Sequence, residues 1–286
     1  MSLLLHPTTR YQLDALVAAQ PHAVMVVGPT GSGKTAIAYE LARRLLDIDT
    51  VTNYPYFLHI QPEKQTLGIE QIRQFKEALR RKTTGQKALR RIILLSDAHM
   101  MTIEAQNAVL KTLEEPPEDT ALLLTTNDIT ALRPTIRSRA QQMLVQPVGQ
   151  EEAKEYFRAQ GFTNAEIDTA FYMSDGRVGL MAAILEAKGD HALVDAIQTA
   201  KKLLQMTVFE RLQQVDSLGK DKAELQILLE ALQRVISSGL KQATAKSNQA
   251  QVKRFYNLSR GVQTAQDAFV ANTNTKLVLT DLFLNL

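Results

Sequence analysis

The sequence predicts an α/β domain with a parallel sheet, followed by two helical domains. Short apolar runs alternate with helical patterns between residues 22 and 146, which is typical of a parallel sheet covered on both faces. After Pro147 the strand signals stop, and the apolar positions follow helical spacing without a sustained heptad or an internal repeat. We therefore expect an α/β domain at 1–147, a small helical domain at 148–188 and an all-α domain at 189–286.

Each element of the first domain has its own signal. Thr8 or Thr9 is the predicted cap of a first helix, and Pro116 stops a later one because the residue before a proline is pushed out of the helical region. Wholly apolar runs predict buried strands, whereas apolar residues three and four apart predict helices. The expected strands are 22–27, 57–60, 92–95, 121–126 and 143–145, and the expected helices are 8–19, 34–46, 69–82, 103–115 and 132–139.

The helical part is predicted from spacing and from breaks. Gly161 and the stretch 175–177 separate three short helices, and Gly189 with Asp190 precedes the longer ones. The expected helices are 150–160, 164–173, 178–188, 191–205, 207–217, 222–245, 249–270 and 275–284.

Composition excludes several classes of site. The 286 residues include no cysteine, so disulfides and thiolate zinc sites are excluded, and the five histidines show no ligand spacing. The first residues lack the features of a signal peptide, and no apolar run approaches the length of a membrane span. We expect a cytoplasmic protein without a membrane partner. The net charge of +3 is too small to argue for nucleic acid.

The strongest motif matches the phosphate-binding pattern G-x-x-x-x-G-K-[ST]. An apolar run precedes it and a helical pattern follows it, which is the strand, loop and helix context that the motif requires. Backbone N–H groups of such a loop surround a polyphosphate, the lysine reaches its terminal phosphates, and the last hydroxyl is a candidate Mg²⁺ ligand. The alternative is a glycine-rich turn that matches by chance. The predicted nucleotide-binding residues are Gly28, Pro29, Thr30, Gly31, Ser32, Gly33, Lys34 and Thr35.

Polar residues follow the next two predicted strands. Asp97 comes after the strand 92–95 and Ser96, and Asn127 comes after the strand 121–126. The carboxyl ends of parallel strands meet at one edge of a sheet, where ligands of such folds bind. We therefore add Asp97 and Asn127 to the candidate nucleotide site.

Basic residues are concentrated between Arg73 and Arg91. This stretch holds eight lysines and arginines against one acid, Glu77. A solvated helix face and a DNA contact patch both explain it, and the charge pattern alone favours the solvated face.

Three further strings resemble the bacterial clamp-loader family of AAA+ proteins. They are Leu-Leu-Ser-Asp-Ala-His at 94–99, Gln-Asn-Ala-Val-Leu-Lys-Thr-Leu-Glu-Glu-Pro-Pro at 106–117, and Pro-Thr-Ile-Arg-Ser-Arg at 134–139. The second string is highly specific to the family, and the resemblance extends by motif to about residue 185. It implies a AAA+ nucleotide-binding domain, a helical lid at 148–188 and a collar at 189–286 through which the subunits of a ring associate.

In that family an arginine after a serine reaches the ATP of a neighbouring subunit. The matching residues here are Ser138 and Arg139, followed by Ala140 where the family has cysteine. A guanidinium delivered in trans stabilises charge on the γ-phosphate, an effect of about 10³ to 10⁵ in rate for known arginine fingers. The resemblance therefore implies a catalytic role for Arg139, with Ser138 beside it. A surface arginine at a helix end is the alternative.

Other positions depart from the family's active ATPases. Where those end a strand in Asp-Glu, this chain has Ser96 and Asp97, and the arginine expected in the lid is Gly179. Arg177 is two residues from that position and faces elsewhere on a helix. The family's zinc module is also absent. We expect ATP or ADP to bind, with Mg²⁺ as its companion and no zinc, and we expect this chain's own hydrolysis to be weak or absent.

Three functions are consistent with these motifs. The first is a stator within a hetero-oligomeric ring of gamma/tau-like and delta-like subunits, which loads a sliding clamp onto primed DNA during replication. The second is an active ATPase motor, which the intact loop favours and Ser96 and Gly179 oppose. The third is a remodelling protein unrelated to replication, which requires the string at 106–117 to be a coincidence.

Overall fold

The computed structural model describes residues 3–63, 66–85, 87–186, 192–245, 247–271 and 273–286. The chain forms two compact units, Met1–Gly149 and Gln150–Leu286. The predicted boundary between lid and collar, at residues 188 and 189, lies outside the described residues, and that division stays a prediction.

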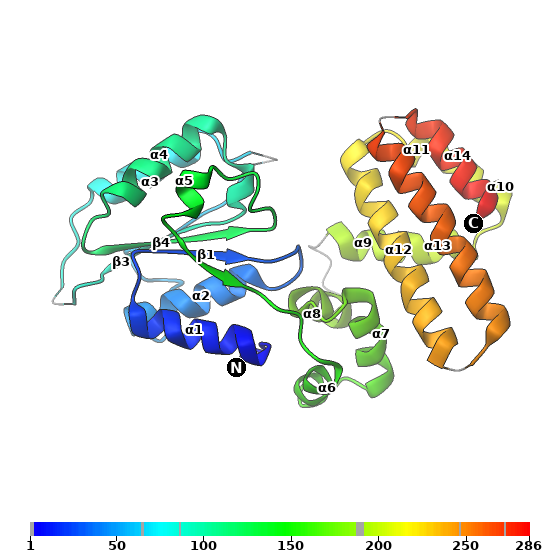
Figure 1. The fold of residues 1–286 in the computed structure, drawn as a ribbon, viewed down its shortest axis with the longest axis horizontal. Helices are drawn as coiled ribbons and strands as arrows, with labels where there is room; N and C mark the ends of the chain where they lie inside the picture. Colours follow the sequence, from blue (N-terminus) through cyan, green and yellow to red (C-terminus); the bar gives the residue numbers. More distant parts are fainter. Residues whose placement is uncertain (1–2, 64–65, 86, 187–191, 246, 272) are drawn as a thin grey trace. The chain divides into compact units, whose positions relative to one another are not determined.

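The first unit is a five-stranded parallel sheet with helices on both faces (Figure 1). The strand order is β2-β3-β4-β1-β5, and every neighbouring pair is parallel. This confirms the predicted fold class. Its elements are α1 (Pro7–Ala19), β1 (Ala23–Val27), α2 (Lys34–Leu46), β2 (Phe57–Ile60), α3 (Ile69–Arg80), β3 (Arg91–Leu95), the 3₁₀ turn η1 (Ala98–Met100), α4 (Ile103–Glu114), β4 (Thr120–Thr126), α5 (Pro134–Arg137) and β5 (Gln141–Leu144).

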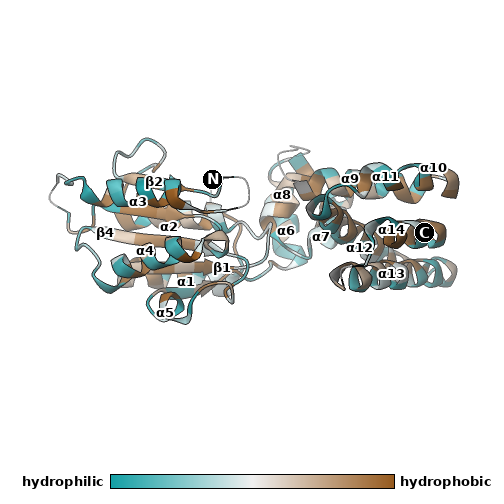
Figure 2. Ribbon diagram, turned by 90° about the horizontal axis from the view of Figure 1, so that it is seen from above, coloured by the Kyte–Doolittle hydropathy of each residue, from teal (hydrophilic) through white to brown (hydrophobic). Residues whose placement is uncertain are grey.

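Alternate residues of the central strands enter two separate apolar cores. Val24 and Leu123 pack with α1 and α2 on one face, whereas Met25 and Leu122 pack with α3 and α4 on the other. Side chains of a strand point alternately to its two sides, so a strand buried on both faces is apolar throughout. In Figure 2 these strands are coloured mostly as hydrophobic, whereas the covering helices carry both colours.

Several ends of elements differ from the predictions, and two of these differences have a clear physical reason. The first helix begins at Pro7, and the His6 side chain accepts the Thr8 N–H, so neither threonine is its cap. Thr9 is buried, and its hydroxyl accepts the Gln146 N–H at 3.0 Å. The last strand begins at Gln141, two residues earlier than predicted, because β5 lies at the edge of the sheet and only one of its four residues is buried.

The second unit is entirely helical within the described residues. Its elements are α6 (Gln150–Arg158), α7 (Asn164–Ser174), α8 (Val178–Glu186), α9 (Ala192–Gln205), α10 (Val208–Gln213), α11 (Val215–Leu218), α12 (Lys222–Ala245), α13 (Gln249–Val270) and α14 (Thr275–Asn285). Among the helices that the structure describes, none combines the length and the apolar composition that a bilayer crossing requires.

One apolar core joins the early and late helices of this unit. Met173 of α7 and Leu180 of α8 belong to the same buried cluster as Leu193 and Leu225 of α9 and α12. Arg234 of α12, itself 7% exposed, donates to the Met173 carbonyl and pairs with Asp175 at 3.2 Å. Helices α7 and α12 are therefore held together by apolar contacts and by a buried arginine.

Candidate functional site

The phosphate-loop motif lies between β1 and α2, as predicted. Gly31 and Gly33 have φ angles of 79° and 86°, the left-handed region that glycine adopts without steric cost. A side chain at Gly28 would meet the Ser32 Oγ at 2.9 Å and the Val145 Cβ at 3.1 Å. The glycines thus permit a tight turn that leads directly into the N-terminus of α2, where helical N–H groups attract anions.

Two side chains of the loop are buried and polar. Ser32 is 7% exposed and Lys34 is 8% exposed, and the Lys34 Nζ donates to the Pro29 carbonyl at 3.2 Å. The Ser32 hydroxyl is buried without a hydrogen-bond partner. A buried hydroxyl left unpaired costs free energy, so its presence points to an oxygen-rich ligand such as phosphate.

The residues after β3 and β4 lie at the same sheet edge as the loop. The Asn127 Nδ2 donates to the Thr30 Oγ1 at 3.2 Å, which joins the end of β4 to the loop directly. Asp97 has a φ of 49°, and its N–H donates to the Thr125 Oγ1 of β4 at 3.0 Å. The structure therefore brings Asn127 against the loop, while Asp97 is fixed at the end of β3 by its backbone.

His99 also lies at this edge, although it was not among the predicted site residues. Burial lowers the pKa of His99, and the charges of Asp97 and Lys34 act on it in opposite directions. Its Nδ1 is buried without a partner. In the sequence, its place at the end of the string 94–99, two residues after Asp97, was the available signal.

A second chain of hydrogen bonds ends at Ser96. The His59 Nε2 lies 2.7 Å from the Ser96 Oγ, and its Nδ1 lies 3.0 Å from the Tyr39 hydroxyl. Tyr39 comes from α2, His59 from the edge strand β2, and Ser96 from the end of β3. Burial lowers the pKa of His59, which favours the neutral imidazole.

Arg139 and Ser138 follow the short helix α5. The Arg139 guanidinium donates to the Thr135 carbonyl at 3.1 Å and pairs with Glu114, the last residue of α4, at 3.2 Å. Its side chain is 37% exposed. The Ser138 hydroxyl donates to the same Thr135 carbonyl at 3.1 Å, so it completes the turn that presents Arg139.

Side chains of α4 hold the segment before α5 in place. The Gln106 Oε1 accepts the Arg133 N–H at 3.0 Å, and its Nε2 donates to the Ala131 carbonyl at 3.2 Å. Asn107 accepts from the Arg133 guanidinium at 2.8 Å. Two residues of the string at 106–117 thus position the helix that precedes Arg139.

Comparison with known proteins places these motifs in one family. A family model described as "DNA polymerase III, delta subunit" matches residues 10–149. The DNA polymerase III subunit delta' of Pseudomonas aeruginosa is 29% identical over 67% of this chain and 64% of its own length. That of Escherichia coli is 27% identical over 63% of this chain and 61% of its own length. Over residues 10–149 the chain is therefore similar to the delta-prime subunits of the clamp-loader AAA+ family.

The match to these delta-prime relatives spans a little under two thirds of their length. A crystal structure of a DNA polymerase III gamma subunit-related protein from Thermotoga maritima superposes with a TM-score of 0.54. That structure is 19% identical and covers 96% of this chain and 97% of its own. At this identity the likeness supports the fold alone.

Position 179, where the resemblance to active clamp-loader ATPases implies an arginine, is Gly179, the second residue of α8. Arg177, just before α8, pairs with Glu230 of α12 at 3.8 Å, and burial lowers its pKa. Arg177 is therefore directed to a helix of its own unit.

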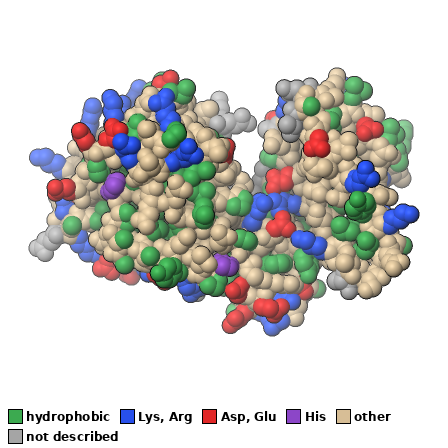
Figure 3. All heavy atoms as spheres, viewed as in Figure 1, with side chains coloured by type: hydrophobic (Ala, Val, Ile, Leu, Met, Phe, Trp, Pro, Cys, Tyr) green, Lys and Arg blue, Asp and Glu red, His purple; other side chains and the backbone are tan. Residues whose placement is uncertain are grey.

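Half of the basic stretch is engaged in ion pairs within the first unit. Arg73 pairs with Glu70 and Lys87 with Asp47, while Arg90 and Arg91 both approach Asp119. Lys76, Arg80, Arg81 and Lys82 are exposed. Lysine and arginine side chains gather over the side of this unit where α3 and α4 lie (Figure 3). The stretch therefore contains structural pairs as well as an exposed basic face.

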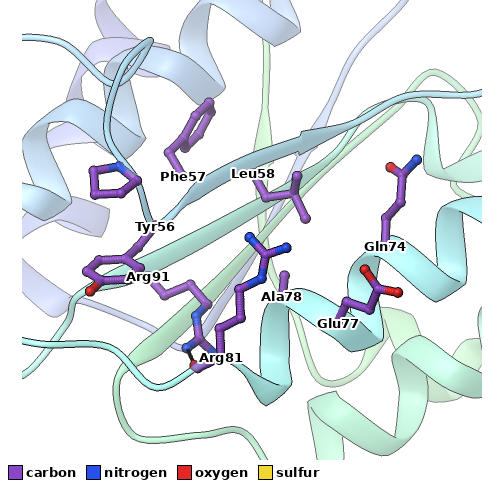
Figure 4. Close-up of a pocket in the computed structure, with 9 residues that line it drawn as sticks. Tyr56, Phe57, Leu58, Gln74, Glu77, Ala78, Arg81 and Arg91 are labelled. Carbon is purple, nitrogen blue, oxygen red and sulfur yellow. Dashed lines mark hydrogen bonds between the residues drawn. The ribbon is translucent and has the colours of Figure 1, made fainter.

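Arg91 is the buried member of this stretch. It is 4% exposed, and its guanidinium donates to the Leu79 carbonyl at 3.2 Å and to the Arg81 carbonyl. It lines a pocket of about 270 Å³ with Tyr56 of the segment before β2 and with Glu77 of α3 (Figure 4). Arg91 thus ties the end of α3 to β3, which is a structural role.

Proposed function

We propose that this protein is a clamp-loader subunit that acts as a stator and supplies Arg139 in trans to the ATP site of a neighbouring subunit. The observation that carries the proposal is the placement of Arg139 on the surface at the end of α5. Its described partners, Glu114 and the Thr135 carbonyl, belong to the region of α4 and α5 and not to this chain's own phosphate loop. The similarity to DNA polymerase III delta-prime subunits supports the role of a clamp-loader subunit.

The loop's own surroundings support a stator over a motor. Ser96 is a neutral residue engaged by His59, and Asp97 is one methylene shorter than the glutamate that orients water in the family's motors. Gly179 provides no cation in the lid. Without these groups the charge that develops on a γ-phosphate is poorly stabilised, so the chain's own turnover is expected to be weak or absent.

The partners follow from this role. Gamma/tau-like and delta-like subunits would form the hetero-oligomeric ring with it through their collar helices, within the DNA polymerase III holoenzyme in the cytoplasm. The sliding clamp and primed DNA would be engaged by the assembled complex.

The test is a pair of substitutions in the reconstituted clamp loader. Arg139→Ala is expected to lower the DNA-dependent ATPase rate of the complex by on the order of 10²-fold or more, because the trans guanidinium is lost. Lys34→Ala is expected to leave clamp loading largely intact. Arg158→Ala, which removes an exposed arginine from α6, is the matched control and should change neither rate. The reverse ranking of the first two variants would contradict the stator role.

An active ATPase motor is the second candidate, because the loop's glycines, Ser32 and Lys34 have the geometry of an intact phosphate site. Steady-state ATP hydrolysis by the purified chain separates the two. A rate that Lys34→Ala abolishes favours the motor, and no turnover favours the stator.

A further inference from the structure

The hydrogen-bonded chain of Tyr39, His59 and Ser96 occupies the end of β3, where the family's motors carry an aspartate that helps to hold Mg²⁺. Ser96 is 4% exposed, its N–H donates to the Ile60 carbonyl at 2.9 Å, and its hydroxyl lies on the His59 ring nitrogen at 2.7 Å. The other ring nitrogen of His59 is hydrogen-bonded to the hydroxyl of Tyr39, a residue of α2. Backbone and side-chain contacts therefore both fix Ser96.

This chain of groups carries no negative charge. It consists of two hydroxyls and an imidazole, and a neutral imidazole offers one donor and one acceptor nitrogen. Both nitrogens are already paired. Position 96 thus offers a cation only a hydroxyl that His59 already engages.

Few anionic ligands for Mg²⁺ lie among the described residues around the loop. Proteins usually hold it through one or two carboxylates together with substrate phosphates. Within the part of the chain that the structure describes, no three histidine, cysteine, aspartate or glutamate side chains gather as a metal site. Asp97 is the carboxylate next to position 96, and its charge acts on His59 and His99. Thr35 offers a neutral, exposed hydroxyl.

A polyphosphate, by contrast, fits the same loop. The unpaired buried Ser32 hydroxyl, the two left-handed glycines and Lys34 all provide donors or room for phosphate oxygens. The described side chains therefore provide more for the phosphates of a nucleotide than for the metal that normally accompanies them.

We propose that the loop binds a nucleoside di- or triphosphate with an affinity that does not depend on Mg²⁺, and that His59 is the positioning residue that keeps position 96 closed to the metal. The inference rests on nucleotide binding by the loop, which the proposed function includes, but it does not rest on Arg139.

His59 makes a specific prediction about restoring the missing aspartate. In Ser96→Asp the new carboxylate would lie at hydrogen-bond distance from the imidazole, and the two would form an ion pair. The carboxylate would then pair with His59 and would not be available to bind Mg²⁺. Only Ser96→Asp combined with His59→Gln would leave it open to Mg²⁺.

The experiment measures the dissociation constant of fluorescent N-methylanthraniloyl-ADP for the full chain, in excess MgCl₂ and in EDTA. For the wild type, Ser96→Asp and His59→Gln, the two values are expected to agree within about twofold. For Ser96→Asp/His59→Gln, Mg²⁺ is expected to tighten binding on the order of tenfold. Circular dichroism verifies that each variant is folded.

A nuclear magnetic resonance titration gives an independent readout of His59. Ser96→Asp is expected to raise the pKa of His59 above its wild-type value, with His59→Gln identifying the signal. A purely structural role of His59 would not produce this shift together with unchanged metal dependence.

Three results would overturn the inference. They are wild-type ADP binding that strengthens markedly with Mg²⁺, no ADP binding in either condition, and metal dependence in Ser96→Asp alone. The first two need no variant, so a double variant that fails to fold leaves the inference falsifiable. None of these results affects the trans role of Arg139, which the ATPase of the complex tests separately.

Discussion

Arg139 combines a charge with a planar set of donors, and the two contributions are separable. Arg139→Lys keeps the charge but loses the fork of N–H groups that matches phosphate oxygens. We expect the ATPase rate of the reconstituted complex to fall nearly as far with lysine as with alanine.

We expect that a change in stability does not account for the lower ATPase rate of Arg139→Lys. The pair between Arg139 and Glu114 is more than a third exposed on both sides, so it contributes at most about 1 kcal/mol. Thermal melting of Arg139→Lys should therefore match the wild type. Wild-type ATPase with lysine would mean that charge alone suffices at this position.

At the residue scale the motifs predicted much of the candidate site. The loop, Asn127 and Arg139 carry recognisable patterns, and the structure places Asn127 against Thr30. The partners of Ser96 were not predictable in the same way. His59 reaches Ser96 because β2 and β3 pair in a particular register, and neither the pairing nor the register is visible in a single sequence.

Two glycines within long helices make opposite predictions at the scale of the element. At Gly239 of α12 an added methyl would lie 2.6 Å from ring atoms of Phe255 on α13. Alanine gains about 1 kcal/mol in helix propensity but overpacking costs about 1 to 3 kcal/mol, so Gly239→Ala should destabilise the unit. At Gly261 of α13 no atom lies within 4 Å, so Gly261→Ala should stabilise it by about 0.5 to 1 kcal/mol.

Urea denaturation followed by circular dichroism at 222 nm measures both effects on the full chain. The two variants change the same residue type in neighbouring helices, so each is the control for the other. Equal shifts in the same direction would show that the close approach of α12 and α13 at Gly239 does not limit side-chain size.

Helices and strands that are completely buried were predicted more accurately than those that are partly exposed. The strands β3 and β4 are buried throughout and appear in the sequence as apolar runs. The edge strand β5 exposes three of its four residues, so the apolar pattern predicted the strand only from Met143 onward. Helix α5 spans only Pro134–Arg137 and is shorter than predicted. Its ends were hard to predict because one turn of helix provides too few positions for a periodic pattern.

At the scale of the molecule, each unit has its own apolar interior. Two clusters on the faces of the sheet use only residues of the first unit, and a third uses only residues of the second. A region with its own core is able to fold alone if it is large enough to bury sufficient apolar surface. Helices α7 and α8 of the predicted lid do not meet this condition separately, because Met173 and Leu180 belong to the core shared with α9 and α12.

We therefore expect fragments cut after Gly149 to fold and a fragment cut inside the second unit to lose stability. Residues 1–149 and 150–286, expressed separately, should each unfold in one cooperative transition monitored by circular dichroism. Residues 189–286 should be markedly less stable than 150–286, since each buried methionine or leucine taken from a core costs about 2 to 5 kcal/mol. If 189–286 were as stable as 150–286, then Met173, Leu180 and the Arg234 contacts would not stabilise the collar, and lid and collar would be separate folding units.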